Sequence, residues 1–126
     1  MDQGGKVKPD DQQELRLWQR WRHHNDSKAR ALLIDRYLHL VRINAVKIFR
    51  ANTPAALDLR DLTQSGTIGL MEAIERFDFE AGFERFSAFA TKRIKGAIKD
   101  GLKNESEYAA QQAQRKRIYR ERSKSL

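Results

Sequence analysis

The stretch LRDLTQSGTIGLMEAIERFDFEAGFERFSAFATKRIKGAIKDGLK, residues 59–103, decides the fold of this chain. In its first half apolar residues recur every three or four positions, which predicts an amphipathic helix that Asp58 caps and that ends near Phe77. The positions on its apolar face are Leu59, Leu62, Gly66, Leu70, Ala73, Ile74 and Phe77. A short aromatic turn follows, made with Phe79, Gly82, Phe83 and Phe86.

Two glycines lie inside this predicted helix. Gly66 and Gly69 each destabilise a helix by about 1 kcal/mol relative to alanine. Two such residues in one helix indicate that a neighbouring helix packs closely on that side.

The second half of the stretch predicts another helix, with Ser87 as its N-cap and Phe86 placed to pack back on Ala90. At about 100° per residue, one arc of this helix is apolar and buried; it holds Ala90, Ile94, Ala97 and Ile98. The opposite arc holds Phe89, Lys92, Lys95, Gly96, Lys99 and Lys103. Lysines that contact phosphates, and an aromatic ring that stacks on an unpaired base, are typical of a surface for a nucleic-acid strand. The alternative is that the lysines form an ordinary solvated face and that Phe89 belongs to the core.

The composition agrees with a polyanionic partner. The chain has 126 residues, with 25 lysines and arginines against 17 aspartates and glutamates, so its net charge is +8. Such a charge favours nucleic acid or an anionic membrane surface. Because the polar N-terminus is unlike a secretory signal and no apolar run reaches the roughly 20 residues of a membrane span, we expect a soluble cytoplasmic protein with no membrane partner.

The remaining segments complete an all-α fold, a compact bundle of about four helices. Residues 1–10 are expected to be disordered, and helices are predicted at residues 11–24 and 27–50. The domain therefore covers residues 11–103. Residues 104–126 form a basic, polar extension that is either frayed or ordered by a partner, although the last helix can continue past Asp100.

Enzymatic chemistry has no support in the sequence. The chain has no cysteine and three histidines, and the adjacent His23 and His24 cannot chelate one ion together, while His39 stands alone. No nucleophile lies beside a plausible base, and the glycines form no phosphate loop. We therefore expect no enzyme, no metal and no cofactor.

The segment LRDLTQSGTIGLMEAIERFD, followed by FSAFATKRIKGAIKD, closely resembles the core promoter-binding domain, region 2, of bacterial sigma factors, and most of all the alternative factors of the flagellar and sporulation type. The preceding LIDRYLHLVRINAVKIF is similar to the helix that packs beneath it. The resemblance covers about residues 14–103. It implies that the helix at residues 61–77 binds the coiled coil of the β′ subunit of core RNA polymerase. The contacts that it implies are Asp61, Gln64, Ser65, Thr67 and Met71.

The resemblance also implies that the next helix captures the non-template strand of the −10 promoter element and holds it melted. Phe89 aligns with the aromatic residue that stacks on a flipped adenine. The positions that contact the strand align with Lys92, Arg93, Lys95, Gly96 and Lys99. Base flipping is unfavourable by a few kcal/mol, so the isolated domain should bind single strands weakly.

Three features depart from the family pattern. Lys92-Arg93 stands where housekeeping factors carry a tryptophan pair, and one extra residue separates Gly82 from Phe86. The chain also lacks a helix-turn-helix for the −35 element, so we expect a fragment of a longer factor, whose extension begins the missing region 3, or a protein that works with a separate subunit.

The sequence leaves two rival hypotheses. The first is a sigma-like regulator, or one half of a two-subunit factor, that binds polymerase without autonomous promoter recognition. The second is a basic helical nucleic-acid binder that acts without polymerase. An anti-sigma factor is a further partner that the exposed apolar and aromatic groups could serve.

Overall fold

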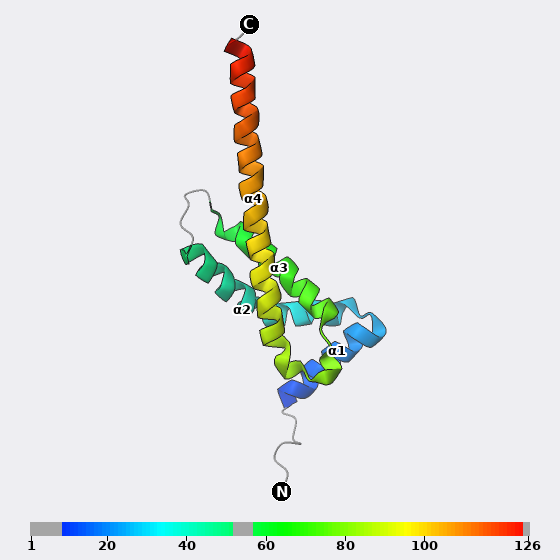
Figure 1. Cartoon of the computed structure of the whole chain (residues 1–126). Helices are drawn as coiled ribbons and strands as arrows, with labels where there is room; N and C mark the ends of the chain where they lie inside the picture. Colours follow the sequence, from blue (N-terminus) through cyan, green and yellow to red (C-terminus); the bar gives the residue numbers. More distant parts are fainter. Residues whose placement is uncertain (1–8, 52–56, 125–126) are drawn as a thin grey trace.

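The computed structural model describes residues 9–51 and 57–124, and this part of the chain is entirely helical apart from short turns. The all-α prediction is therefore confirmed. Four α-helices follow one another in the chain (Figure 1): α1 Pro9–His24, α2 Ser27–Ala51, α3 Leu59–Arg76 and α4 Phe86–Lys124. Two short 3-10 turns, Phe79–Ala81 and Phe83–Arg85, connect α3 to α4.

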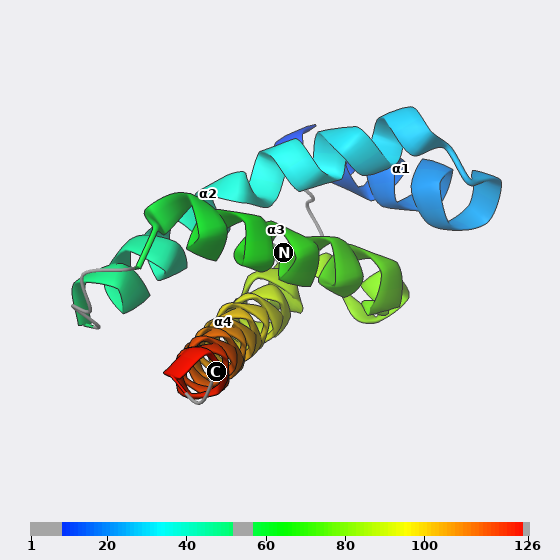
Figure 2. The same ribbon diagram turned by 90° about the horizontal axis from the view of Figure 1, so that it is seen from above.

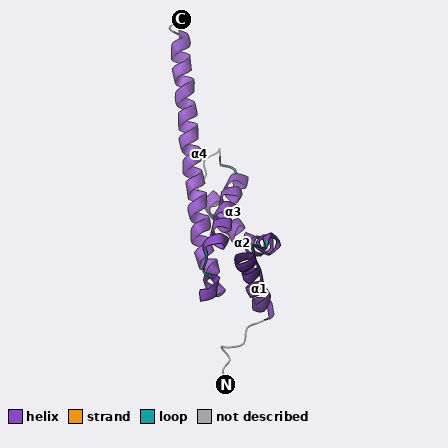
Figure 3. Ribbon diagram, turned by 90° about the vertical axis from the view of Figure 1, so that its right-hand side faces the viewer, coloured by secondary structure: helices purple, strands orange, loops and turns teal. Residues whose placement is uncertain are grey.

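α2 and α3 lie at the centre of the helix packing. α1 folds back along α2, and α3 packs against both α2 and α4 (Figure 2). α4 is much longer than the others, and its C-terminal half projects away from the remaining helices (Figure 3). The large side chains buried completely at the centre are Trp18, Leu33, Val41, Leu70, Ile74, Phe86, Ile94 and Ile98.

Aromatic rings join α1 to the turn between α3 and α4. The Trp18 ring lies 5.0 Å from Phe86, 5.8 Å from Phe77 and 5.9 Å from Phe79 between ring centroids. Tyr37 of α2 meets the same Phe86 ring at 4.6 Å. Offset and edge-to-face pairs at these distances stabilise a core beyond their buried area. The turn is consequently fixed by rings from α1 and α2, two elements far away in the sequence.

The close helix approach that the two glycines predicted is present. A Cβ on Gly69 would lie 2.7 Å from the Arg93 carbonyl oxygen and 3.0 Å from the Ile94 Cα, both backbone atoms of α4. A Cβ on Gly66 would lie 2.9 Å from Cγ1 of Val41 in α2. α3 therefore touches α4 almost backbone to backbone at Gly69.

This contact predicts that the same substitution, glycine to alanine, has opposite effects on stability at two positions. Gly69→Ala is expected to lower the free energy of unfolding by about 1–2 kcal/mol, because the strain of overpacking exceeds the gain of about 1 kcal/mol in helix propensity. Gly96→Ala is expected to raise it by about 1 kcal/mol, because nothing lies within 4 Å of a Cβ at Gly96. Urea unfolding followed by circular dichroism measures both. Equal shifts in the two variants would contradict the close approach.

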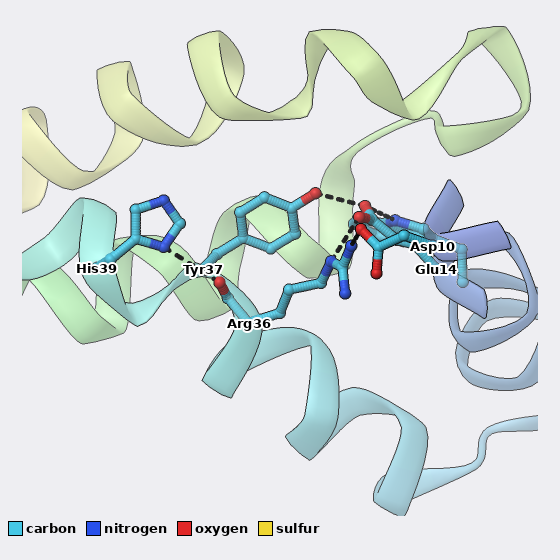
Figure 4. A network of polar contacts seen from close by, with 6 residues as sticks. Asp10, Glu14, Arg36, Tyr37 and His39 are labelled. Atoms are coloured by element: carbon cyan, nitrogen blue, oxygen red, sulfur yellow. Dashed lines mark hydrogen bonds and ion pairs between the residues drawn. The ribbon is translucent and has the colours of Figure 1, made fainter. Parts of the chain in front are cut away.

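A buried carboxylate connects α1 to α2 (Figure 4). The side chain of Glu14, only 4% exposed, accepts hydrogen bonds from Trp18 Nε1 at 3.0 Å, from Arg36 Nε at 2.7 Å and from the Tyr37 hydroxyl. Arg36 also pairs with Asp10. Burial, together with the hydrogen bond to Glu14, raises the pKa of Tyr37 well above its ordinary value. The phenol therefore stays protonated and acts as a donor to the carboxylate.

The helix boundaries follow the predicted ones, with local corrections. Asp58 caps α3 as predicted, since its side chain accepts from the Arg60 backbone N–H at 2.8 Å. α1 begins at Pro9, so the predicted disorder is wrong for residues 9 and 10. The pairing of Asp10 with Arg36 holds this first turn. The predicted disorder of residues 1–8 lies outside the described residues.

The predicted cap at Ser87 is wrong. α4 begins at Phe86, whose backbone is already helical (φ −62°, ψ −41°), and the Phe86 N–H donates to the Phe83 carbonyl. The preceding 3-10 turn starts the winding, so no separate N-cap is needed. Gly82, with φ +117°, makes the reversal that allows this turn.

Candidate nucleic-acid interface

The outward side of α4 carries exposed cations above an open patch of backbone. Lys92, Lys95 and Lys99 are exposed, and Gly96 leaves its own backbone uncovered. None of these lysines has an ion-pair partner among the described residues. Their charges are available to an external anion, and Gly96 allows that anion to approach the helix closely.

Phe89 does not lie wholly on the outward arc, so this part of the prediction is wrong. Its side chain is half-buried, and its ring lies 5.3 Å from the Phe77 ring between centroids. The Arg93 guanidinium lies over the Phe89 ring, 5.6 Å from its centroid. The guanidinium therefore covers one face of the ring, and a base that stacked on that face would have to displace Arg93.

A groove of about 440 Å³, open to solvent, runs along the contact between α3 and α4. From α3 it is lined by Ser65, Ile68 and Glu72, and from α4 it is lined by Lys92, Arg93, Gly96, Ala97, Asp100, Gly101 and Asn104. It therefore brings one residue of the predicted polymerase-binding set, Ser65, beside three residues of the predicted DNA-binding set. The two interfaces that the resemblance implied are neighbours across this groove.

The other predicted lysines belong to a different groove, between α2 and α4. Lys95 and Lys99 line it together with Lys47 of α2, over a floor that includes Ile48 and Leu102. The predicted DNA-binding residues are thus divided between the two sides of α4. The sequence could not assign Lys47 to this groove, because spacing within α2 says nothing about which residues of α4 it meets.

The α3 residues predicted to bind polymerase differ in their exposure. Asp61 and Gln64 are exposed, while Ser65, Thr67 and Met71 are partly buried. The Thr67 hydroxyl donates to the Thr63 carbonyl at 2.8 Å, so this hydroxyl already has a partner within the helix.

Sequence reasoning missed the largest apolar group of this surface. Ile68 is 56% exposed and lies one turn from both Gln64 and Glu72 on α3. The signal was available: Ile68 falls outside the periodic apolar stripe of its helix, and an apolar residue outside the stripe is either incidental or part of an interface.

No described helix is long and apolar enough to span a bilayer. Within the described residues, histidine and acidic side chains form no group of three or more that could hold a metal ion.

Comparison with known proteins identifies the family. Residues 33–108, more than half of the chain, match the family described as Sigma-70 region 2. The chain therefore belongs to the sigma-70 region 2 family. It is 38% identical over 89 residues to the RNA polymerase sigma-D factor of Bacillus subtilis (strain 168), a match that covers 71% of this chain and 34% of that protein.

Two further relatives agree. The chain is 40% identical over 94 residues to the RNA polymerase sigma factor RpoS of Coxiella burnetii, covering 75% of this chain and 25% of that protein. It is 42% identical over 72 residues to the RNA polymerase sigma factor FliA of Escherichia coli (strain K12), a match that covers 57% of this chain and 29% of that protein. The chain thus spans about a third or less of the length of these relatives.

Proposed function

We propose that this chain serves transcription initiation as a sigma-type domain, which joins core RNA polymerase through α3 and captures the melted non-template strand of the −10 promoter element through α4. The single observation that carries the proposal is the α3–α4 groove. It places the exposed Ile68 of α3 beside Lys92 and Arg93 of α4. The family match and the relatives named as sigma factors support the same assignment.

In this proposal the two helices have separate tasks. Ile68, with Gln64 and Asp61 beside it, supplies an apolar contact with a polar rim for the β′ coiled coil, which is the usual composition of a protein interface. On α4, Lys92 and Lys95 neutralise strand phosphates, and Phe89 stacks on a flipped base. The backbone at Gly96 lets the strand lie close to the helix.

Binding to the β′ coiled-coil fragment, followed by binding to fluorescent single strands with and without that fragment, tests the proposal. We expect the chain to bind β′ and then to capture a −10-like strand in a base-dependent way. Binding to β′ without base preference would favour the regulator or split-subunit hypothesis. Base-independent, strongly salt-dependent binding without any affinity for β′ would leave only a basic helical nucleic-acid binder.

One substitution tests the polymerase surface specifically. Ile68→Asp is expected to weaken β′ binding roughly ten-fold or more, because apolar anchors at the centre of an interface carry much of its affinity. Ile43→Asp on α2 is the matched control, since Ile43 is 48% exposed against 56% for Ile68 and the charge change is the same. Fluorescence anisotropy with labelled β′ fragment measures both. Equal effects of the two variants would remove α3 from the interface.

A further inference from the structure

The C-terminal end of α3 is capped by an arginine from another helix. Nη1 of Arg22, in the last turn of α1, donates to the Phe77 carbonyl oxygen and lies 3.5 Å from the Ile74 carbonyl oxygen. The last carbonyl groups of an α-helix have no partner within the helix, and a cation is favourable at that end of the helix dipole. Arg22 therefore supplies a donor and a charge that α3 cannot supply itself.

α1 holds the same residue, Phe77, at a second point. Trp18 lies one helical turn before Arg22, so the two side chains leave α1 on the same side. The Trp18 ring lies 5.8 Å from the Phe77 ring between centroids, while Arg22 binds the Phe77 carbonyl. Trp18 is itself completely buried. Because both its ring and its carbonyl are held by α1, Phe77 is fixed in orientation as well as in position.

Phe77 in turn supports the candidate stacking residue. Its ring is buried and lies 5.3 Å from the Phe89 ring between centroids. A side chain adopts one of a few rotamers, and close packing against a fixed neighbour selects among them. Since Phe89 is only half-buried, the Phe77 ring is a contact that can decide which face Phe89 turns outward. A chain of contacts thus leads from Arg22 through Phe77 to Phe89.

A second contact from the same end of α1 is more exposed. Nε2 of His23 lies 2.9 Å from Oε1 of Glu80, with side chains that are 50% and 66% exposed. The His23 ring also lies 5.5 Å from the Phe79 ring between centroids. Such exposed pairs contribute little, and this one reaches the turn after α3 rather than Phe77. Arg22 is therefore the polar group of α1 through which Phe77 is held.

We propose that Arg22 is a positioning residue for strand capture, which acts through Phe77 to hold the Phe89 ring in the orientation on which a base stacks. The proposal rests on the proposed function for the role of Phe89. It gives a part in the strand site to α1, which precedes the family match at residues 33–108. The affinity for the strand then falls with the fraction of time in which the ring is correctly oriented.

The first test needs no DNA. The full chain is prepared with isotope-labelled phenylalanine, and the ring signals of Phe89 in the NMR spectrum are those that disappear in Phe89→Leu. Arg22→Met is expected to broaden these signals and shift them toward the averaged values of a freely rotating side chain. Unchanged Phe89 signals in Arg22→Met would overturn the proposal.

Arg30→Met is the matched control. It removes the same guanidinium from a neighbouring place, where Arg30 lies 5.4 Å from the Trp21 ring centroid and pairs with Glu75 at 3.2 Å. It should lower the melting temperature by a few degrees, as Arg22→Met does, and leave the Phe89 ring signals in place. Equal changes of these signals in both variants would reduce Arg22 to a general contribution to stability and overturn the proposal.

The second test is a double-mutant cycle on the binding of a fluorescent −10-like single strand in the presence of the β′ fragment, well below the melting temperature of every variant. Arg22→Met is expected to raise the Kd about five-fold, which corresponds to a ring correctly oriented about a fifth of the time. In a Phe89→Leu chain the same substitution should change the Kd by less than about two-fold, because no ring is left to orient. Arg22→Lys keeps a cation and an N–H donor and should restore most of the affinity.

The outcomes separate the two proposals. Independent, multiplicative effects of Arg22→Met and Phe89→Leu on the Kd would overturn the positioning role of Arg22. Failure of the proposed function has a different signature: the native chain would bind strands without base preference, while the Phe89 ring signals would still respond to Arg22→Met and not to Arg30→Met.

Discussion

Glu14→Ala is expected to lower the free energy of unfolding by about 3 kcal/mol, a large fraction of the stability of a small domain. The substitution leaves Trp18 Nε1 and the Tyr37 hydroxyl without their acceptor in a buried site, and each orphaned donor destabilises by about 1–3 kcal/mol. It also removes the carboxylate that pairs with Arg36, so α1 loses its main polar attachment to α2. Urea unfolding followed by tryptophan fluorescence measures the loss.

Glu75→Ala is the matched control for this substitution. Glu75 also pairs with an arginine of α2, since its Oε1 lies 3.2 Å from Nη2 of Arg30, but its side chain is 50% exposed. A solvent-exposed pair of this kind contributes about 0–1 kcal/mol. If Glu14→Ala were no more destabilising than Glu75→Ala, the buried network would not be what holds α1 to α2.

Features with a local cause were predictable from the sequence. The apolar periods defined all four helices, and the N-cap of α3 followed from Asp58 alone. The glycines were informative because Gly66 and Gly69 lower the stability of the helix itself. Such residues are expected inside a helix where a neighbouring element packs closely against them. The sequence did not show which helices these neighbours are: side chains of both α2 and α4 lie beside Gly66, and the backbone of α4 lies beside Gly69.

Features with a long-range cause were not predictable. Glu14 looked like one more polar residue of α1, and only the packing of α2 places Arg36 and Tyr37 against it. The position of Phe86 has a similar long-range cause, because its ring packs against Trp18 of α1 and Tyr37 of α2. α4 also continues through Gly101, where a Cβ would lie 2.5 Å from the Ser65 Oγ, so the close approach of α3 favours glycine at this position.

The candidate site was predictable in its residue types and less so in its arrangement. The outward lysines of α4 are exposed as the arc predicted. These lysines are divided between two grooves because α3 and α2 pack on different sides of α4. A helical wheel of α4 alone cannot predict that packing. Ile68 shows the same limit, since its position in the groove beside α4 depends on the packing of the two helices rather than on the pattern of its own helix.

Phe89→Leu is expected to weaken binding to a −10-like single strand by roughly 5- to 100-fold while leaving β′ binding unchanged. Stacking of one base on an aromatic ring contributes about 1–3 kcal/mol, and leucine offers no such face. Leucine keeps most of the apolar volume that packs on Phe77, so the loss of stability should stay below about 1.5 kcal/mol. Equilibrium binding of a fluorescent strand in the presence of the β′ fragment measures the effect.

Phe83→Leu is the matched control, because Phe83 is also half-buried against the core but lies in the turn before α4. It should destabilise the fold by a similar amount and leave strand binding unaltered. A further variant, Arg93→Ala, uncovers the ring by removing the guanidinium that lies over it. It should lose a phosphate contact without losing base preference.

The comparison of these variants separates the two roles open to Phe89. If the ring only completes the core, Phe89→Leu and Phe83→Leu will lower strand binding together, in proportion to their loss of stability. If the ring is a stacking platform, base preference will disappear in Phe89→Leu alone and persist in Arg93→Ala. The half-buried position makes both roles compatible: packing on Phe77 fixes the orientation of the ring, and a ring already held in place loses less conformational entropy when a base stacks on it.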